Sequence, residues 1–159
     1  MAEVKASEFF KLASGEARGG DSLNVYGNII DAKVLATDSR GAFYLMEQTT
    51  EPNCGSPLHV HHREDEGFYV LQGEFLFEIG GEQIHAKPGD YVWAPRDVPH
   101  LFHNEGSTVG RCLVSSSPPG VEAFFEEVAK LTVPPDPATV APIFARYGLE
   151  LLGPPFAYR

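Results

Sequence analysis

The residues of this chain best suited to chemistry gather in one short stretch, SPLHVHHREDEGFYVLQGEF, at residues 56–75. Three histidines and four carboxylates lie within it. Alternate residues of a β-strand face the same way, so an extended LHVHH segment places His59 and His61 on one face and His62 on the other. A pair of neutral imidazoles on one face of a strand is suited to binding a metal ion.

A carboxylate and a further histidine complete a possible ligand set. Glu66 follows a short turn and opens the next expected strand, and His100 begins a later strand in the segment PGDYVWAPRDVPHLFHN. If these strands are neighbours in a barrel, both side chains converge with the histidine pair on one point inside it. Imidazoles with a carboxylate suit a divalent transition metal, and four protein ligands on an octahedral ion leave two positions open for reaction.

The elements that must position these side chains are short strands separated by turn sequences. Segments rich in β-branched and aromatic residues predict strands at 28–36, 42–50, 58–62, 67–73, 74–80, 82–86, 90–95, 100–104 and 110–116. The Gly80-Gly81 pair between two alternating segments indicates a tight hairpin. Many short strands at close spacing favour an antiparallel barrel or sandwich.

The C-terminal third has helical periodicity instead. Apolar residues at helical spacing predict a helix over 120–131, and a proline-rich break follows at 133–137. Asp136 is placed to cap a second helix that ends at Gly148, and Pro142 is expected to kink or restart it. Neither helix can bury its apolar face alone, so we expect both to pack on the outside or one mouth of the β-domain.

Two motifs in order resemble those of the cupin superfamily. His59-x-His61-x4-Glu66-x6-Gly73 is similar to the first cupin motif, and Gly89-Asp90-x4-Pro95-x4-His100-x3-Asn104 is similar to the second. Two departures occur, neither of them at a donor atom. Asp97 stands where the second motif usually has a glycine, and Gly55 lies closer to His59 than the leading glycine of the first motif usually does.

The resemblance implies an all-β cupin fold, a double-stranded β-helix (jelly-roll) barrel. The resemblance covers the barrel at about 23–117, after a short N-terminal segment. The length of the chain fits one domain over residues 1–159, with the expected C-terminal α-helices at about 120–150 packed on the barrel. The resemblance also implies one divalent ion of Fe, Mn, Ni, Co, Cu or Zn. The expected metal ligands are His59, His61, Glu66 and His100.

The same resemblance implies a metal-dependent oxidoreductase similar to the quercetinase-type flavonol dioxygenases. Such an enzyme cleaves an aromatic or enolic substrate such as a flavonol. Glu66 is the expected catalytic residue, either as a ligand throughout or as a base that takes a proton from the substrate. Two alternatives stay open: a non-redox isomerase, lyase or hydrolase, and a non-enzymatic cupin that binds a metal or small ligand without turnover.

Aromatic residues near the motifs favour a flat or apolar organic substrate, and no Lys/Arg pair beside them offers a phosphate clamp. The expected substrate-pocket residues are Phe68, Val70, Phe75, Phe77, Trp93 and Phe102; Tyr26, Phe43, Met46 and Tyr91 are further candidates whose faces the pattern does not assign. The helix with Phe124 and Phe125, or the tail at 142–156, is a candidate lid over the mouth.

Other polar residues have simpler interpretations. We expect the run His62, Arg63, Glu64 and Asp65 to form an exposed turn, His85 to face solvent, and Asn104 to tie down its turn. For His103 the pattern leaves open a surface position or a subunit contact. Cys112 fits a buried strand residue, whereas Cys54 fits a loop cysteine better than a ligand or a reactive thiol.

Composition narrows the possible partners. The formal net charge is −10 and no Lys/Arg cluster occurs, so binding to nucleic acid or to an acidic membrane surface is disfavoured. Two cysteines are too few for a disulfide framework. Without a signal-like start or a long apolar run, we expect a cytoplasmic protein. The family resemblance further implies a homodimer in which a strand such as NIIDAKVLA pairs across subunits.

Overall fold

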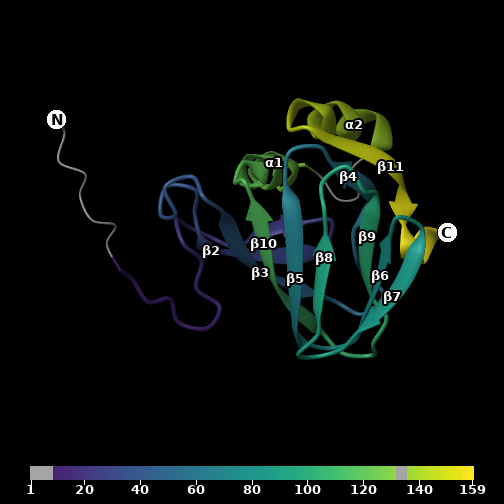
Figure 1. Cartoon of the computed structure of the whole chain (residues 1–159), viewed down its shortest axis with the longest axis horizontal. Helices are drawn as coiled ribbons and strands as arrows, with labels where there is room; N and C mark the ends of the chain where they lie inside the picture. Colours follow the sequence, from purple (N-terminus) through teal and green to yellow (C-terminus); the bar gives the residue numbers. More distant parts are fainter. Residues whose placement is uncertain (1–8, 132–135) are drawn as a thin grey trace.

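The computed structural model describes residues 9–131 and 136–159 and shows two antiparallel sheets that close into a jelly-roll barrel (Figure 1). One sheet has, in order, β1 (Leu23–Val25), β2 (Asn28–Val34), β3 (Tyr44–Thr50), β10 (Gly110–Ser117), β5 (Asp65–Gln72) and β8 (Tyr91–Ala94). The other has β11 (Leu149–Pro155), β4 (Pro57–His61), β9 (His100–Asn104), β6 (Phe75–Ile79) and β7 (Glu82–Ala86). The predicted all-β jelly roll is confirmed. Residues 133–135 of the expected break lie outside the described residues.

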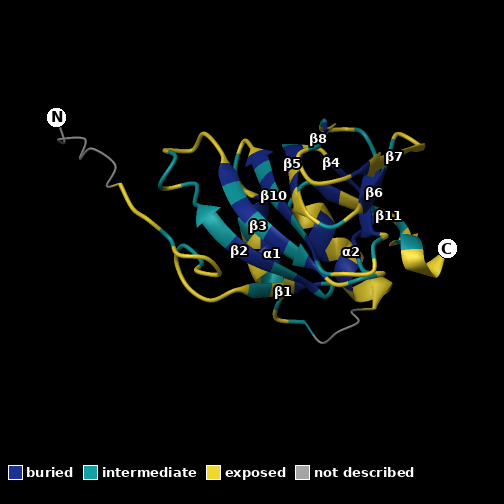
Figure 2. Cartoon of the chain, turned by 90° about the horizontal axis from the view of Figure 1, so that it is seen from below, coloured by how far each residue is buried: buried dark blue, intermediate teal, exposed yellow. Residues whose placement is uncertain are grey.

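Alternating side chains explain why these segments form a barrel. On β3 the buried residues are Tyr44, Met46, Gln48 and Thr50, and the residues between them are only partly buried. Strands of this pattern bury one face against the opposite sheet and leave the other face to solvent. Figure 2 shows the result, with the buried positions of the strands gathered in the middle of the barrel.

The turn between β6 and β7 is the predicted tight hairpin. Ile79 pairs with Glu82, which leaves Gly80 and Gly81 as the two turn residues, with φ of 58° and 86°. Both values are positive, as a type I′ turn requires, and glycine adopts such values without steric cost.

Two helices lie together over one end of the barrel (Figure 1). Helix α1 (Val121–Val128) buries Val121, Phe124, Phe125 and Val128, and α2 (Pro137–Arg146) buries Val140, Ile143 and Phe144. The hydroxyl of Tyr147 donates to Glu127 at 2.7 Å, which ties the end of α2 to α1. The predicted packing of C-terminal helices on the barrel is therefore confirmed.

Helix α2 begins and ends as the sequence predicts. Asp136 is its N-cap, but the carboxylate accepts from the hydroxyl of Thr139 at 3.3 Å rather than from a backbone N–H. Pro142 lies inside the helix without ending it, and Gly148, with φ of 73°, follows its end. Neither helix in the described part of the chain has the length and hydrophobicity that a bilayer crossing requires.

The strand β11 was not predicted. It pairs antiparallel with β4, with Leu149 opposite His61 and Leu151 opposite His59, and leads into the short 3-10 helix η1 (Phe156–Tyr158). The pairing becomes irregular around Gly153 and Pro155. Because β11 is an edge strand, its prolines interrupt no central ladder. The tail therefore braces the outside of β4, the strand that carries two of the candidate ligands.

Candidate metal centre

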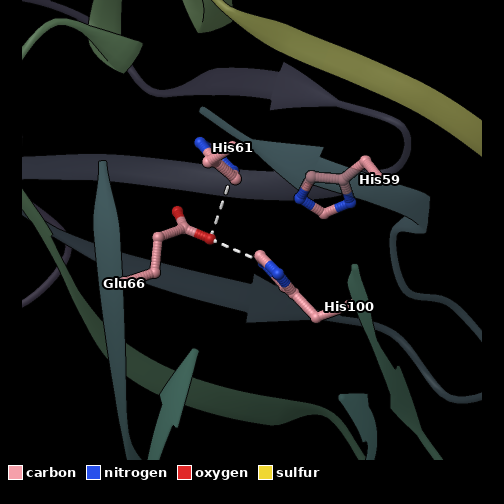
Figure 3. A group of neighbouring side chains, drawn as sticks. All are labelled: His59, His61, Glu66 and His100. Atoms are coloured by element: carbon pink, nitrogen blue, oxygen red, sulfur yellow. Dashed lines mark hydrogen bonds and ion pairs between the residues drawn. The ribbon is translucent and has the colours of Figure 1, made fainter. Parts of the chain in front are cut away.

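The four predicted ligands come from three strands and meet inside the barrel (Figure 3). His59 and His61 lie on β4, Glu66 on β5 and His100 on β9, where His100 pairs directly with His59. All four are at least nine-tenths buried, with exposures of 8%, 3%, 4% and 1%. The β4 pair shares one face, as the two-residue spacing predicted.

The donor atoms lie close enough to share one ion. Oε2 of Glu66 is 3.3 Å from Nε2 of His61 and 3.0 Å from Nε2 of His100. One donor atom from each of the four residues lies within 4.8 Å of the others. Two ligands on opposite sides of an ion with bonds of about 2.1 Å lie roughly 4.2 Å apart. The side chains therefore fit a metal ion after a small contraction of the cluster.

A hydrogen-bond acceptor also faces the second ring nitrogen of each histidine. Nδ1 of His59 lies 2.8 Å from the carbonyl oxygen of Pro57, and Nδ1 of His100 lies 3.1 Å from that of Val98. Nδ1 of His61 lies 3.2 Å from Oε2 of Glu64. With the hydrogen on Nδ1, each ring offers its Nε2 lone pair to an ion, and this is how protein metal sites commonly fix histidine ligands.

The pKa values of the cluster reflect burial and mutual attraction. Burial opposes the charge on Glu66, but His61 and His100 outweigh it and hold the pKa of Glu66 well below its usual range. Burial also opposes protonation of His61, yet Glu66 and Glu64 raise its pKa to about 10. Burial, with the charges of the other two histidines, lowers the pKa of His59. Glu66 therefore stays a carboxylate, and an ion must compete with a proton on His61.

An apolar cavity of about 50 Å³ adjoins the cluster. Its lining comprises Val25, Tyr26, Asn28, Ile30, Met46, Gln48, Ser56, Pro57, His59, His61, Glu66, Phe68, Phe102, Phe124, Phe125, Phe144 and Leu149. The ring of Phe144 lies 6.4 Å from that of His59, edge to face, so α2 packs directly above the candidate ligands. Side chains of both helices therefore form part of the cavity wall.

Only part of the expected pocket set lines this cavity. Phe68 and Phe102 do. The lining does not include Val70, Phe75 or Phe77, which are almost fully buried in the barrel core. Trp93 is 50% exposed, because it lies on the outer face of β8 between the buried residues Val92 and Ala94.

The run after the β4 histidines is not uniformly exposed, and one prediction there is wrong. His62 and Arg63 are exposed as expected, but Glu64 is only 2% exposed. The carboxylate of Glu64 faces His61. Gly120, just before α1, also lies against Glu64, since a Cβ added to Gly120 would be 3.6 Å from Oε1 of Glu64. Asp65 is half-buried and pairs with Arg96 at 2.9 Å.

The remaining histidines lie away from the cluster. His85 is exposed and contacts Glu105 at 2.6 Å, as its predicted solvent position implies. His103 takes neither of the two positions left open by the sequence. It is buried beneath the C-terminal segment of its own chain, with its ring 5.2 Å from that of Phe156. The metal-binding group found among the described residues does not include Cys54.

The backbone conformation of Asp97 explains why the second motif tolerates an aspartate where the cupin pattern usually has a glycine. Asp97 has φ of 65°, the left-handed conformation that glycine adopts most easily and aspartate tolerates. Its carboxylate lies 2.7 Å from Nδ1 of His62. Asn104 donates to the carbonyl oxygens of Thr50 and Thr108, both at 2.9 Å, and so ties its turn as predicted.

Several residues of the site escaped the sequence analysis. The candidate partner of His61, Glu64, lies in a run of charged residues whose composition indicates solvent. Gln48 and Phe144 also line the cavity, and for Phe144 nothing in the local pattern indicates this. The alternation along β3 placed Gln48 on the face of Met46, which was the available signal for an inward polar residue.

Comparison with known proteins agrees with this fold. Residues 46–116 match the family model of the cupin domain. A 62-residue stretch is 34% identical to an uncharacterized protein of Methanocaldococcus jannaschii and covers 39% of this chain and 50% of that protein. Over 105 residues the chain is 25% identical to the oxalate-binding protein of Thermotoga maritima, covering 66% of this chain and 84% of the relative. The match therefore spans half the length of the first relative and most of the second.

A solved structure supports the fold independently. The polyketide cyclase RemF from Streptomyces resistomycificus superposes with a TM-score of 0.59, covering 70% of this chain and 81% of that chain. The two sequences are 21% identical, so the likeness concerns the fold and not the reaction.

Proposed function

We propose that this chain, whose residues 46–116 match the family model of the cupin domain, is a metal-dependent dioxygenase that acts on a small enolic or aromatic compound. One observation carries the proposal: three histidines and one glutamate, all buried, direct donor atoms at one point beside an apolar cavity. Without an ion, the buried negative charge of Glu66 is balanced only by its contacts with His61 and His100, and a divalent ion at the centre of the cluster would balance it directly.

The ion would be held by Nε2 of the three histidines and by the carboxylate of Glu66. When bound, a divalent transition metal supplies Lewis acidity and open positions for an oxygen ligand. The chain itself orients the rings, because Pro57, Glu64 and Val98 each present an acceptor to one Nδ1. The ligand set suits Fe, Mn, Ni, Co, Cu or Zn.

Glu66 is the proposed acceptor of the substrate's proton. Its low pKa keeps it ionised at neutral pH, as a proton acceptor must be, but also makes it a weak base. Transfer of a proton from an enolic or phenolic hydroxyl would therefore depend on the metal ion to stabilise the resulting anion. Its Oε1 accepts a hydrogen bond from the hydroxyl of Ser116 at 3.3 Å, which holds the carboxylate while Oε2 faces the histidines. Glu66 thus combines the roles of ligand and base.

The cavity limits the size of the substrate. At about 50 Å³ it is much smaller than the roughly 150 Å³ cavity that holds a benzene molecule in an engineered protein core. A flavonol therefore enters only if the aromatic side chains of Phe124, Phe125 and Phe144 move with their helices. Small compounds of a few heavy atoms need less rearrangement, and we propose them as the primary substrates.

A second candidate function is metal-dependent binding of a small ligand without oxygen chemistry. Two observations favour it: the small cavity, and the similarity to a relative named an oxalate-binding protein. A non-redox isomerase, lyase or hydrolase would use the same ligands with Glu66 as proton carrier. These alternatives differ from the dioxygenase in one measurable property, the uptake of O₂.

Oxygen uptake by the metal-loaded protein tests the proposal. The protein is reconstituted with each of the six ions in turn and mixed with catechols, 1,3-diketones and a flavonol in an oxygen electrode. We expect substrate-dependent uptake with at least one ion, its loss after chelation, and its loss in E66A. H85A, which removes an exposed histidine of β7, is the matched control and should retain the activity. If the protein holds its ion and binds the test compounds but consumes no oxygen with any of them, the dioxygenase proposal is wrong. Metal-dependent ligand binding without oxygen chemistry would then be the function that remains.

A further inference from the structure

Two residues that line the cavity each carry a buried polar atom with no hydrogen-bond partner among the described residues: the hydroxyl of Tyr26 and Nε2 of Gln48. Other polar side chains of the lining are satisfied. Oδ1 of Asn28 accepts from Thr50 at 2.9 Å, while its Nδ2 donates to the backbone of Gly55 at 3.1 Å. Buried polar groups are nearly always paired, so two unpaired donors on residues that line the same cavity require an explanation.

The side-chain amide of Gln48 lies where bulk solvent does not supply it with a hydrogen bond. Gln48 lies in the middle of β3, between the neighbouring strands β2 and β10, with Ile30 and Cys112 as its register partners. Only 4% of the residue is exposed, and it shares the inward face of β3 with Met46, which also lines the cavity. The amide therefore belongs to the cavity wall and not to the protein surface.

Tyr26 lies in a tight turn whose backbone conformation is unfavourable for a tyrosine. Val25 pairs with Asn28, so Tyr26 and Gly27 form a two-residue hairpin turn, with φ of 55° and 81°. Asparagine, aspartate and glycine are the preferred first residues of such a turn, and a bulky aromatic residue at positive φ is uncommon. Unfavourable backbone conformations of this kind persist mostly where a side chain serves a function.

The charge of the lining restricts what these donors can hold. Once a metal ion has displaced the proton of His61, Glu66 is the only charged side chain among the described residues that line the cavity, and no Lys or Arg contributes to it. The negative charge of a substrate is therefore balanced by the metal ion alone. A second anionic group at the far end would be desolvated without a cation, which is unfavourable. Neutral oxygen acceptors, such as a ketone or an amide carbonyl, carry no such penalty when they accept hydrogen bonds.

We propose that Tyr26 and Gln48 form the second anchoring point of the substrate site, where they donate to a neutral carbonyl oxygen of a monoanionic substrate whose anionic oxygen faces the metal. The proposal rests on the metal centre proposed above and names the substrate class for that site. Burial raises the pKa of Tyr26 to about 12, so the phenol stays protonated and acts as a donor at neutral pH.

Matched ligand pairs test this assignment without turnover. Zinc-loaded protein is titrated calorimetrically with pyruvate, acetoacetate and levulinate, and with propionate, butyrate and valerate. Each oxo acid differs from the alkanoate of equal length by one carbonyl oxygen, placed at a different distance from the carboxylate. In the wild type, at least one oxo acid should bind about tenfold more tightly than its alkanoate, the gain expected of one or two hydrogen bonds.

Two near-isosteric variants remove the donors one at a time. In Y26F and Q48M the preference for that oxo acid should fall towards unity, while affinity for the alkanoate, zinc content and fold stay unchanged. Y147F and Q72M are the controls, since they remove a phenol and an amide that lie outside the cavity lining and should keep the preference. The melting temperatures of Y26F and Q48M should equal or exceed that of the wild type, because each variant removes an unpaired buried polar group.

The outcomes separate this inference from the proposed function. If zinc binds and the oxo acids bind no more tightly than the alkanoates, or the preference survives in both variants, the assignment of Tyr26 and Gln48 is wrong while the metal centre stands. A fall in melting temperature without a change in preference would assign both groups to the fold and would also overturn it. Failure to bind zinc would remove the metal centre and the inference together.

Discussion

The buried carboxylate of Glu64 lies 3.2 Å from Nδ1 of His61. The opposite ring nitrogen, Nε2, faces Glu66 and the rest of the cluster. Glu64 therefore fixes the orientation of the ring from the side that faces away from the candidate metal position. Carboxylates in this position increase the basicity of a histidine ligand and select the Nε2 lone pair for the metal. Glu64 therefore acts as a positioning residue for His61 without being a ligand.

Replacing Glu64 should weaken metal binding without abolishing it. For E64Q we expect a loss of about 10- to 100-fold in metal affinity, measured by competition with a chromogenic chelator. D97N is the matched control, because Asp97 contacts a different histidine, His62, at the surface, and its removal should leave affinity unchanged. Equal affinity of E64Q and the wild type would show that the His61 contact has no influence on the ion.

Phe144 should be important for both stability and the size of the cavity. It is 2% exposed, and its ring packs edge to face on Phe124 at 4.7 Å between centroids. F144A should lower the free energy of unfolding by about 3–5 kcal/mol, as for other buried aromatic residues, and should enlarge the space above His59. Urea unfolding measures the first effect. F9A, at a fully exposed phenylalanine, should stay within about 0.5 kcal/mol of the wild type. A similar loss in both variants would contradict the packing described.

The thiol of Cys112 should make stability depend on alkaline pH. Burial raises its pKa to about 12 in the folded chain, whereas the ordinary value is 9.0. Between these values the folded protein keeps a proton that the unfolded chain has lost. The unfolded state then binds fewer protons, and the free energy of unfolding falls as pH rises above about 9, by at most about 1.4 kcal/mol per unit.

Chemical unfolding between about pH 8 and 10 measures this slope. C112A should make the slope shallower, while His61, whose pKa is raised to about 10, leaves a remaining fall in the same direction. C54A, at the partly exposed cysteine, should keep the full slope. Because C112A also changes core packing, the comparison uses the slope and not the absolute stability. Identical slopes in C112A and the wild type would mean that the buried thiol does not cause the effect.

Asp97 provides a test of backbone conformation beside the site. Its φ of 65° suits glycine, so D97G should change the free energy of unfolding by less than about 1 kcal/mol, relief of strain offsetting the loss of an exposed ion pair. A β-branched residue does not adopt this conformation easily, and D97V should lose about 1–3 kcal/mol. Equal stability of the two variants would argue against a left-handed Asp97.

Sequence reasoning recovered the barrel because its signals are local. Alternation along segments such as β3, and the glycine pair between β6 and β7, reflect the two-residue period of strands and the geometry of tight turns. The ligand pair His59 and His61 follows from the same period. The convergence of Glu66 and His100 required the neighbourhood of β4, β5 and β9, which the motif resemblance supplied.

What the sequence analysis missed depends on contacts between distant segments. Glu64 looks exposed in its charged run, but Gly120, before α1, and His61 both lie against its carboxylate. The strand β11 contains Gly153, Pro154 and Pro155, which disfavour a strand except at the edge that β4 offers it. Trp93 illustrates the limit for aromatic residues, since composition does not reveal which face of β8 is inward.

The most direct test of the account is metal titration of the protein after removal of bound ions, with X-ray absorption spectroscopy of the loaded form. We expect one equivalent of at least one of the six divalent ions per chain. The spectrum should show only nitrogen and oxygen neighbours, with the scattering signature of three imidazoles. H61A should lose the site, and H85A should retain it. No binding of any of these ions, or equal binding by H61A and the wild type, would contradict the shared site of His59, His61, Glu66 and His100.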